Sequence, residues 1–147
     1  MENHRRVIAA LLCLPLLTTS VWAGNALALR GPDIIALFEG KTLSGVYADG
    51  SPVKETYAVG GKIPDYVDAV RSSTGKWSVV NDQLCTFYDE QMAGGCFRVE
   101  KVSGNCFDYL VLSSSEEEAL APTEKPRYTA RAHIEGIPTT CPSDLSV

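Results

Sequence analysis

The sequence predicts a mostly β protein: a small antiparallel meander or up-and-down β-barrel of 7–8 strands, disulfide-stapled, with one short N-terminal helix. Short segments of alternating apolar and polar residues recur at a spacing of roughly 8–12 residues, with turn-forming residues between them. One stretch near the N-terminus has helical spacing instead. An even number of cysteines remains once a predicted export signal is set aside, which favours stapling by disulfides.

Residues 1–28 have the features of a secretory signal peptide. Two arginines precede an apolar run of about 16 residues, which is short against the roughly 20 needed to span a bilayer. Ala26-Leu27-Ala28 forms an A-x-A cleavage site, so Leu29 is the predicted first mature residue. Cleavage after Ala23 is the alternative. The sequence therefore predicts export, to the periplasm or the extracellular space.

The predicted mature chain, residues 29–147, is short enough to form a single β domain. Loss of Arg5, Arg6 and Glu2 with the signal changes the net charge from −5 to −6. A negative domain without a basic cluster argues against a nucleic-acid partner. No later apolar stretch approaches transmembrane length, so no transmembrane segment is predicted in the mature chain.

Residues 31–40, "GPDIIALFEG", predict the short helix. Pro32 suits the first helical turn, and Gly40 suits the end of the helix. Three apolar residues at positions i, i+3 and i+4 would face the core: Ile34, Leu37 and Phe38.

Alternation predicts strands across most of the remaining chain. The predicted strands are residues 42–48, 53–59, 65–71, 76–80, 83–89, 96–102, 106–112 and 127–137. A long polar loop, residues 113–126, precedes the last of them. Rolling such strands into a barrel would remove exposed sheet edges.

Four cysteines remain once Cys13, which lies in the predicted signal, is discounted: Cys85, Cys96, Cys106 and Cys141. An even number in an exported chain predicts two disulfides. The cysteines include no C-x-x-C pair, and the mature chain has one histidine, His133. A zinc site would thus need three cysteines with His133, or all four cysteines. We therefore predict no metal and no cofactor.

The turn positions favour one of the three possible disulfide connectivities. A hairpin that pivots within "EQMAGG" places Cys85 opposite Cys96, close enough for a disulfide. The following turn, "SGN", would place Cys106 opposite Val102 and away from Cys96. The predicted pairs are therefore Cys85 with Cys96, and Cys106 with Cys141.

Four stretches together carry a resemblance: "ALFEGKTLSG", "YADGSPVKETY", "GKWSVVNDQLC" and "GGCF". They resemble small secreted alphaproteobacterial proteins of families of unknown function, which share a short helix, a G-x-T strand, a G-x-W strand and a paired-cysteine hairpin. This resemblance implies export and a stapled β fold, but no particular activity. The Gly75-x-Trp77 element is also similar to that of lipocalin- and avidin-like barrels, where it lies in the first strand. Periplasmic protease-inhibitor barrels are similar in architecture.

Catalytic groups do not form a recognisable set in the sequence. His133 lies in an alternating strand, where a solvent-facing or barrel-lining histidine is the ordinary interpretation. A catalytic base would need a nucleophile and an orienting carboxylate, but no G-x-S-x-G is present and paired cysteines leave no thiol. The carboxylates are scattered over turns and do not single out a glycosidase pair. We therefore predict that the chain is not an enzyme, with a hydrolase as the weak alternative.

The aromatic residues give the best functional hint. Most should be core, but those that point outward could form a binding surface, since tyrosine is enriched in interfaces. The candidates are Tyr47, Tyr57, Trp77, Tyr88 and Tyr109. They predict a non-catalytic exported barrel that binds an unidentified protein or envelope partner, as an adaptor or inhibitor. The alternative is a small-ligand carrier with a lipocalin-like pocket, since a barrel of about eight strands admits one small ligand at most.

Overall fold

The computed structural model describes residues 26–89, 94–111 and 128–142. Three sequence predictions lie wholly or mostly outside these ranges. They are the signal peptide apart from residues 26–28, the hairpin pivot within residues 90–93, and the polar loop at 113–126.

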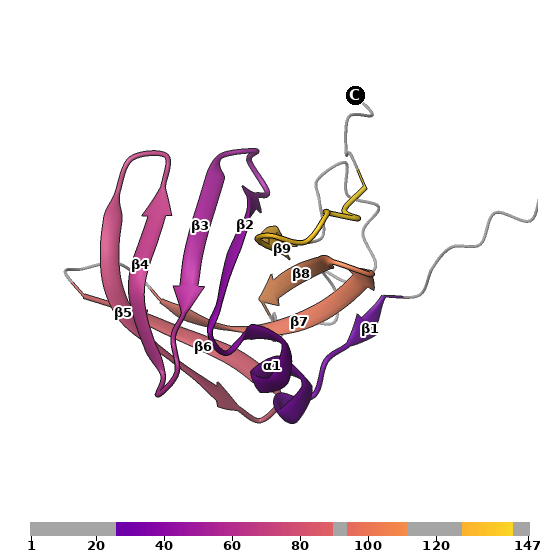
Figure 1. Ribbon diagram of the computed structural model, residues 1–147, viewed down its shortest axis with the longest axis horizontal. Coiled ribbons are helices and arrows are strands. Elements are labelled where there is room, and N and C mark those ends of the chain that lie inside the picture. The colour runs from indigo at the N-terminus through magenta and orange to yellow at the C-terminus, as the bar shows by residue number, and fades with distance from the viewer. Residues whose placement is uncertain (1–25, 90–93, 112–127, 143–147) are drawn as a thin grey trace, which may run out of the picture.

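The described residues form nine strands and one helix, and eight of the strands close into an antiparallel barrel (Figure 1). In chain order the elements are β1 (Leu27–Ala28), α1 (Gly31–Phe38), β2 (Lys41–Tyr47), β3 (Pro52–Tyr57), β4 (Lys62–Asp68), β5 (Ser72–Val80), β6 (Gln83–Tyr88), β7 (Gly95–Ser103), β8 (Cys106–Val111) and β9 (Ala130–Ile134). Strands β2 to β8 form an up-and-down meander. Strand β9 then inserts between β8 and β2 and closes the ring. The predicted barrel is confirmed.

Strand β1 is not part of the ring. It pairs with β7, as β6 does, but further along that strand. Strand β7 pairs with β6 as far as Arg98, and with β1 beyond it, where Leu27 lies opposite Lys101 and Ala28 opposite Glu100. The next residue, Leu29, is buried and donates its N–H to the carbonyl of Val99 at 2.8 Å. The start of the described chain thus covers the free edge of β7.

Helix α1 closes one end of the barrel, which we call the helix end (Figure 1). Pro32 lies in its first turn, as predicted, and the buried N–H of Gly31 donates to Asp82 Oδ1 at 2.7 Å in the β5–β6 turn. Ile34 and Phe38 are fully buried, and the Phe38 ring meets Phe107 edge-on at 5.1 Å. The helix therefore packs its apolar face into the barrel and fills that end of the interior.

The strands run between the helix end and an opposite end, which we call the open end. Strand β2 leaves the helix at Lys41 and reaches the open end at Tyr47. Because each strand is antiparallel to its neighbours, Asp68, Tyr88 and Ala130 also lie at the open end. No helix among the described residues is long and apolar enough to cross a membrane.

Both predicted disulfides are confirmed. Cys85 lies directly opposite Cys96 across β6 and β7, as the hairpin geometry predicts, and the two are bonded. Cys106 is bonded to Cys141. The predicted register at that turn is wrong, because Cys106 lies opposite Ser103 rather than Val102. A register shift between Lys101 and Ser103 moves the pairing by one residue.

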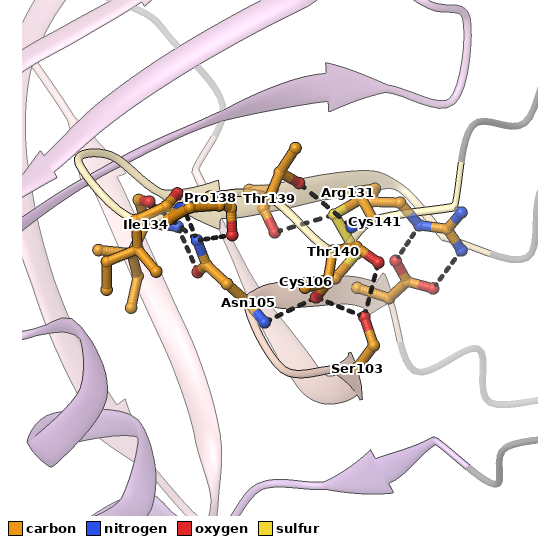
Figure 2. Close-up of a disulfide and its surroundings, with 12 residues drawn as sticks. Ser103, Asn105, Cys106, Arg131, Ile134, Pro138, Thr139, Thr140 and Cys141 are labelled. Carbon is orange, nitrogen blue, oxygen red and sulfur yellow. Dashed lines mark hydrogen bonds and ion pairs between the residues drawn. A yellow bond between two sulfur atoms is a disulfide. The ribbon is translucent and has the colours of Figure 1, made fainter.

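The second disulfide holds residues 135–142, which we call the C-terminal segment, against the β7–β8 turn (Figure 2). Beside it, the buried Asn105 side chain accepts the N–H of Ile134 at 2.9 Å and donates to the carbonyls of Ile134 and Ile137, both at 3.0 Å. Ser103 and Thr140 add a hydrogen bond between their hydroxyl groups at 2.7 Å. The Asn105 amide thus satisfies backbone groups of residues 134 and 137 that are left without a partner strand beyond the end of the β8–β9 pairing.

Candidate functional site

A cavity of about 60 Å³ lies inside the barrel towards the open end. We call it the interior cavity. Its polar lining consists of Tyr47, Glu55, Tyr57, Thr86, Tyr88, Tyr109 and Thr129. Its apolar lining consists of Leu43, Val53, Phe97, Ala130 and Ala132. These residues come from six strands and from the residue before β9, so only closure of the barrel brings them together.

Phe38 of α1 supports the cavity from the helix end. Its ring stacks against Tyr57 at 5.8 Å and against Tyr109 at 6.3 Å between ring centroids. Tyr109 also meets Phe97 edge-on at 6.1 Å. These ring contacts fix the orientation of the aromatic side chains that border the cavity.

Glu55 is the carboxylate inside the barrel wall, and it is only 8% exposed. Alternation along β3 places Glu55 on the inner face together with Val53 and Tyr57. Its Oε2 accepts the hydroxyl of Tyr57 at 2.5 Å, and its Oε1 accepts the hydroxyl of Tyr88 at 2.6 Å. Among the described residues, no lysine, arginine or histidine forms an ion pair with it.

Burial sets the protonation behaviour of this group. It raises the pKa of Glu55 above its ordinary value, while the hydrogen bonds from Tyr57 and Tyr88 act in the opposite direction. Burial also raises the pKa values of Tyr57, Tyr88 and Tyr109. The three phenols therefore remain protonated at neutral pH, and Glu55 is the group in the cavity whose charge can change.

A second hydrogen-bonded chain leads from the cavity to the open end. The hydroxyl groups of Tyr47 and Tyr66 are 2.7 Å apart, and Tyr66 donates to Asp68 Oδ2 at 2.9 Å. Asp68 also accepts the backbone N–H groups of Val70 and Arg71, at 2.8 and 2.7 Å, and forms an ion pair with the Arg71 guanidinium. The hydrogen bond from the Val70 amide, more than any other contact, lowers the pKa of Asp68. Asp68 is therefore ionised at neutral pH and already paired.

The predicted outward surface of aromatic residues is not present. Tyr57, Trp77 and Tyr109 are 1%, 6% and 7% exposed, and Tyr47 and Tyr88 are half-buried. Four of the five line the interior cavity, whereas Trp77 packs edge-on against Tyr57 and donates its Nε1–H to the carbonyl of Ala58 at 2.9 Å. The outward placement was wrong because closure of the barrel turns one face of each strand inward, and these residues lie on that face.

The other candidates lie apart from the cavity. His133 is half-buried on the outer face of β9, opposite Ser44 on β2. Asp108 forms an ion pair with Arg131 at 2.6 Å, and Asp82 binds the first turn of α1. The described residues contain no cluster of three or more histidine, cysteine, aspartate or glutamate side chains that could hold a metal ion.

Glu55 is the residue that reasoning from the sequence overlooked. The signal was present in "VKETY", where strict alternation puts Val53, Glu55 and Tyr57 on one face of a strand. A carboxylate that shares a strand face with an apolar and an aromatic residue is a candidate for burial. Taken together, the cavity offers phenol donors, aromatic surfaces and one carboxylate to a small molecule that enters from the open end.

Comparisons of the chain with protein-family models, with curated proteins and with solved structures find no match. The site is therefore interpreted from its geometry and chemistry alone.

Proposed function

We propose that this chain is an exported, non-enzymatic β-barrel protein that binds a small molecule in its interior cavity. The observation that carries this proposal is the buried Glu55, held by two tyrosine hydroxyls inside a cavity that opens away from α1. Binding pockets commonly combine an apolar wall with a few convergent polar groups. This proposal corresponds to the carrier alternative of the sequence interpretation.

The cavity volume limits what can be bound. An engineered apolar cavity of about 150 Å³ holds one benzene molecule, whereas the interior cavity measures about 60 Å³. A drug-sized ligand would need roughly 300 Å³ or more. The ligand is therefore a small molecule or the small head group of a larger one, with the remainder outside the barrel. A spacious lipocalin-like pocket for a whole hydrophobic ligand is disfavoured.

Export to the periplasm or the extracellular space is the second part of the proposal. Two disulfides are compatible with an oxidising compartment, and the predicted signal peptide supports the same location. Binding of a protein or envelope partner stays a prediction. The inward placement of the five aromatic residues removes the surface on which it was based.

The test is a screen of small amines, alcohols, carboxylates and sugars against the ¹⁵N-labelled protein by NMR. We expect at least one class to shift the backbone amide signals of Leu43, Phe97 and Ala132, which line the cavity. Ala130→Leu, and Ala130→Val as a smaller replacement, would fill the cavity and abolish those shifts. If no class shifts the cavity signals of the wild-type protein, the proposal is wrong.

A further inference from the structure

We infer that the ligand carries a small cationic head group, an alkylammonium, that binds between the tyrosine rings and Glu55. This inference rests on the proposed function and names the class of ligand for the same cavity. It is carried by the charge inside the barrel, by the aromatic lining and by the size of the space.

The charge of the lining is one-sided. Glu55 is its only ionisable group besides the tyrosines, and no lysine, arginine or histidine is among the described lining residues. Asp68 and Arg71 form an ion pair at the open end, so their charges cancel. An anion entering the cavity would meet the Glu55 carboxylate without a compensating positive charge. A cation would gain an attraction strengthened by the low dielectric of the interior.

The aromatic lining favours the same sign of charge. Tyr47, Tyr57, Tyr88 and Tyr109 border the space together with Phe97. The face of an aromatic ring carries negative electrostatic potential, so a ring that turns its face to the space attracts an ammonium group. A neutral molecule of the same shape would obtain the apolar contacts but neither the ring attraction nor the charge of Glu55. The cavity therefore discriminates by charge as well as by size.

Glu55 can accept hydrogen bonds from a cation while it keeps its hydrogen bonds to the two tyrosines. The two tyrosine hydroxyls each occupy one lone pair of a carboxylate oxygen and leave further lone pairs as acceptors. The N–H groups of a primary ammonium could donate to these. Primary ammonium groups occur in free amines and in the ethanolamine head groups of zwitterionic lipids.

Affinity for the cation should depend on the ionisation of Glu55. The groups that face it are the phenols of Tyr57, Tyr88, Tyr109 and Tyr47, none of which ionises near neutral pH. Beyond them, the chain through Tyr66 ends at Asp68, which the Val70 amide and Arg71 keep ionised. Affinity should therefore rise with pH as Glu55 loses its proton, and become constant above its pKa.

The decisive experiment compares methylammonium with methanol by NMR titration of the full exported protein, because both are small enough for a cavity of about 60 Å³. We expect methylammonium to bind at least about tenfold more tightly, in keeping with a desolvated cation–π contact combined with a carboxylate. Propylammonium and propan-1-ol provide the same comparison for a longer primary amine. Equal affinity of the charged and uncharged partners, or binding of neither, would overturn the inference. The proposed function would be overturned only if the wider screen also finds no ligand.

Two variants locate the effect. Glu55→Gln keeps the shape of the side chain and should lower methylammonium affinity about tenfold and remove its pH dependence. Tyr88→Phe, which removes one hydroxyl from Glu55, is a second variant should the first fail to fold. Glu135→Gln removes the same charge from an exposed side chain that contacts Ser44 and Lys54, and it should leave affinity unchanged. If Glu55→Gln binds methylammonium as the wild type does, the inference is wrong.

Vesicles that contain phosphatidylethanolamine test whether the head group comes from a lipid. Flotation of the wild-type protein with these vesicles, reduced in Glu55→Gln, would support the inference with a lipid head group as the ligand. Binding of the soluble cations without flotation would support it with a free amine as the ligand.

Discussion

At the scale of single residues, Glu55 is placed where a carboxylate is costly. Burial favours its protonated form, so the folded state holds the Glu55 proton more tightly than the unfolded chain does. The stabilisation that results is fully present below the ordinary pKa of 4.5 and is lost as the pH rises through the raised pKa of the folded state. Glu55→Gln removes this dependence. Urea unfolding at several pH values should therefore show the stability of the wild type falling relative to this variant as the pH rises.

Glu135→Gln provides a control, because the stability contributed by Glu135 depends on pH in the opposite direction. Hydrogen bonds from Ser44 and then from Lys54 lower the pKa of Glu135, so its contribution is present above the ordinary value and is lost as the pH falls. The stability difference between the wild type and Glu135→Gln should shrink on acidification. A difference between the wild type and Glu55→Gln that does not change with pH would contradict the assignment of Glu55 as a buried titrating group.

Gly45 marks a close approach of β2 and β9 in the barrel wall. A Cβ atom at Gly45 would overlap the backbone carbonyl oxygen of Arg131 on β9 and lie 2.7 Å from the Cα of Ala132. Backbone atoms cannot move aside as the end of a side chain can. Gly45→Ala should therefore destabilise the protein by about 3 kcal/mol through overpacking, as measured by urea unfolding. Gly104→Ala, where a Cβ would meet only Thr140 at 3.6 Å, should cost much less. Equal costs for the two would contradict the close packing of β2 against β9.

At the scale of elements, the two disulfides close loops of different length. Cys85 and Cys96 are 11 residues apart, whereas Cys106 and Cys141 are 35 residues apart. In the chain-entropy model the shorter loop contributes about 2.8 kcal/mol and the longer one about 3.8 kcal/mol. Replacing both cysteines of a pair by serine should therefore cost about 1 kcal/mol more for the longer loop. Unfolding of the two double variants by urea, without reductant, measures this difference.

The comparison also tests what holds the C-terminal segment. Asn105 and Thr140 would still bind that segment after loss of the second disulfide. A double variant at Cys106 and Cys141 that unfolds in two separate steps would indicate that the segment detaches first. A larger cost for the Cys85–Cys96 pair would contradict loop length as the controlling quantity.

Alternation and turn residues predicted all eight strands of the ring and the Cys85–Cys96 disulfide, because these depend on local patterns. The Cys106–Cys141 pair, whose cysteines lie 35 residues apart, was predicted by elimination. Strand β4 was displaced: it was predicted at residues 65–71 but spans Lys62–Asp68. The register shift between Ile63 and Tyr66 absorbs Pro64, and Asp68 ends the strand by binding the amides of the next turn. These effects depend on the partner strand and on a side-chain contact, which alternation within one segment does not contain.

The interior cavity could not be predicted for a related reason. Its lining comes from six strands, and the distance between Glu55 and Tyr88 is set by how the whole sheet closes. The sequence showed which residues share a face of each strand, but not which face would turn inward. Hence the aromatic residues were identified as important and assigned to the wrong side.

At the scale of the whole molecule, the start of the described chain is joined to the barrel by β1. The predicted cleavage after Ala28 would remove Leu27 and Ala28, which pair with β7, whereas the alternative cleavage after Ala23 would retain them. Both side chains are exposed, so their contribution comes from the strand pairing rather than from apolar burial. Each hydrogen bond contributes roughly 1 kcal/mol net.

Two forms of the protein, residues 24–147 and 29–147, should therefore differ in stability by about 1–2 kcal/mol in favour of the longer form. Urea unfolding measures the difference, and hydrogen exchange at Lys101 locates it, because β7 loses its β1 partner there in the shorter form. A third form, residues 24–147 with Leu27→Pro, separates pairing from length, since proline removes a backbone donor. If the proline form is as stable as its parent, then β1 adds nothing to the barrel. In that case cleavage after Ala28 would carry no energetic penalty.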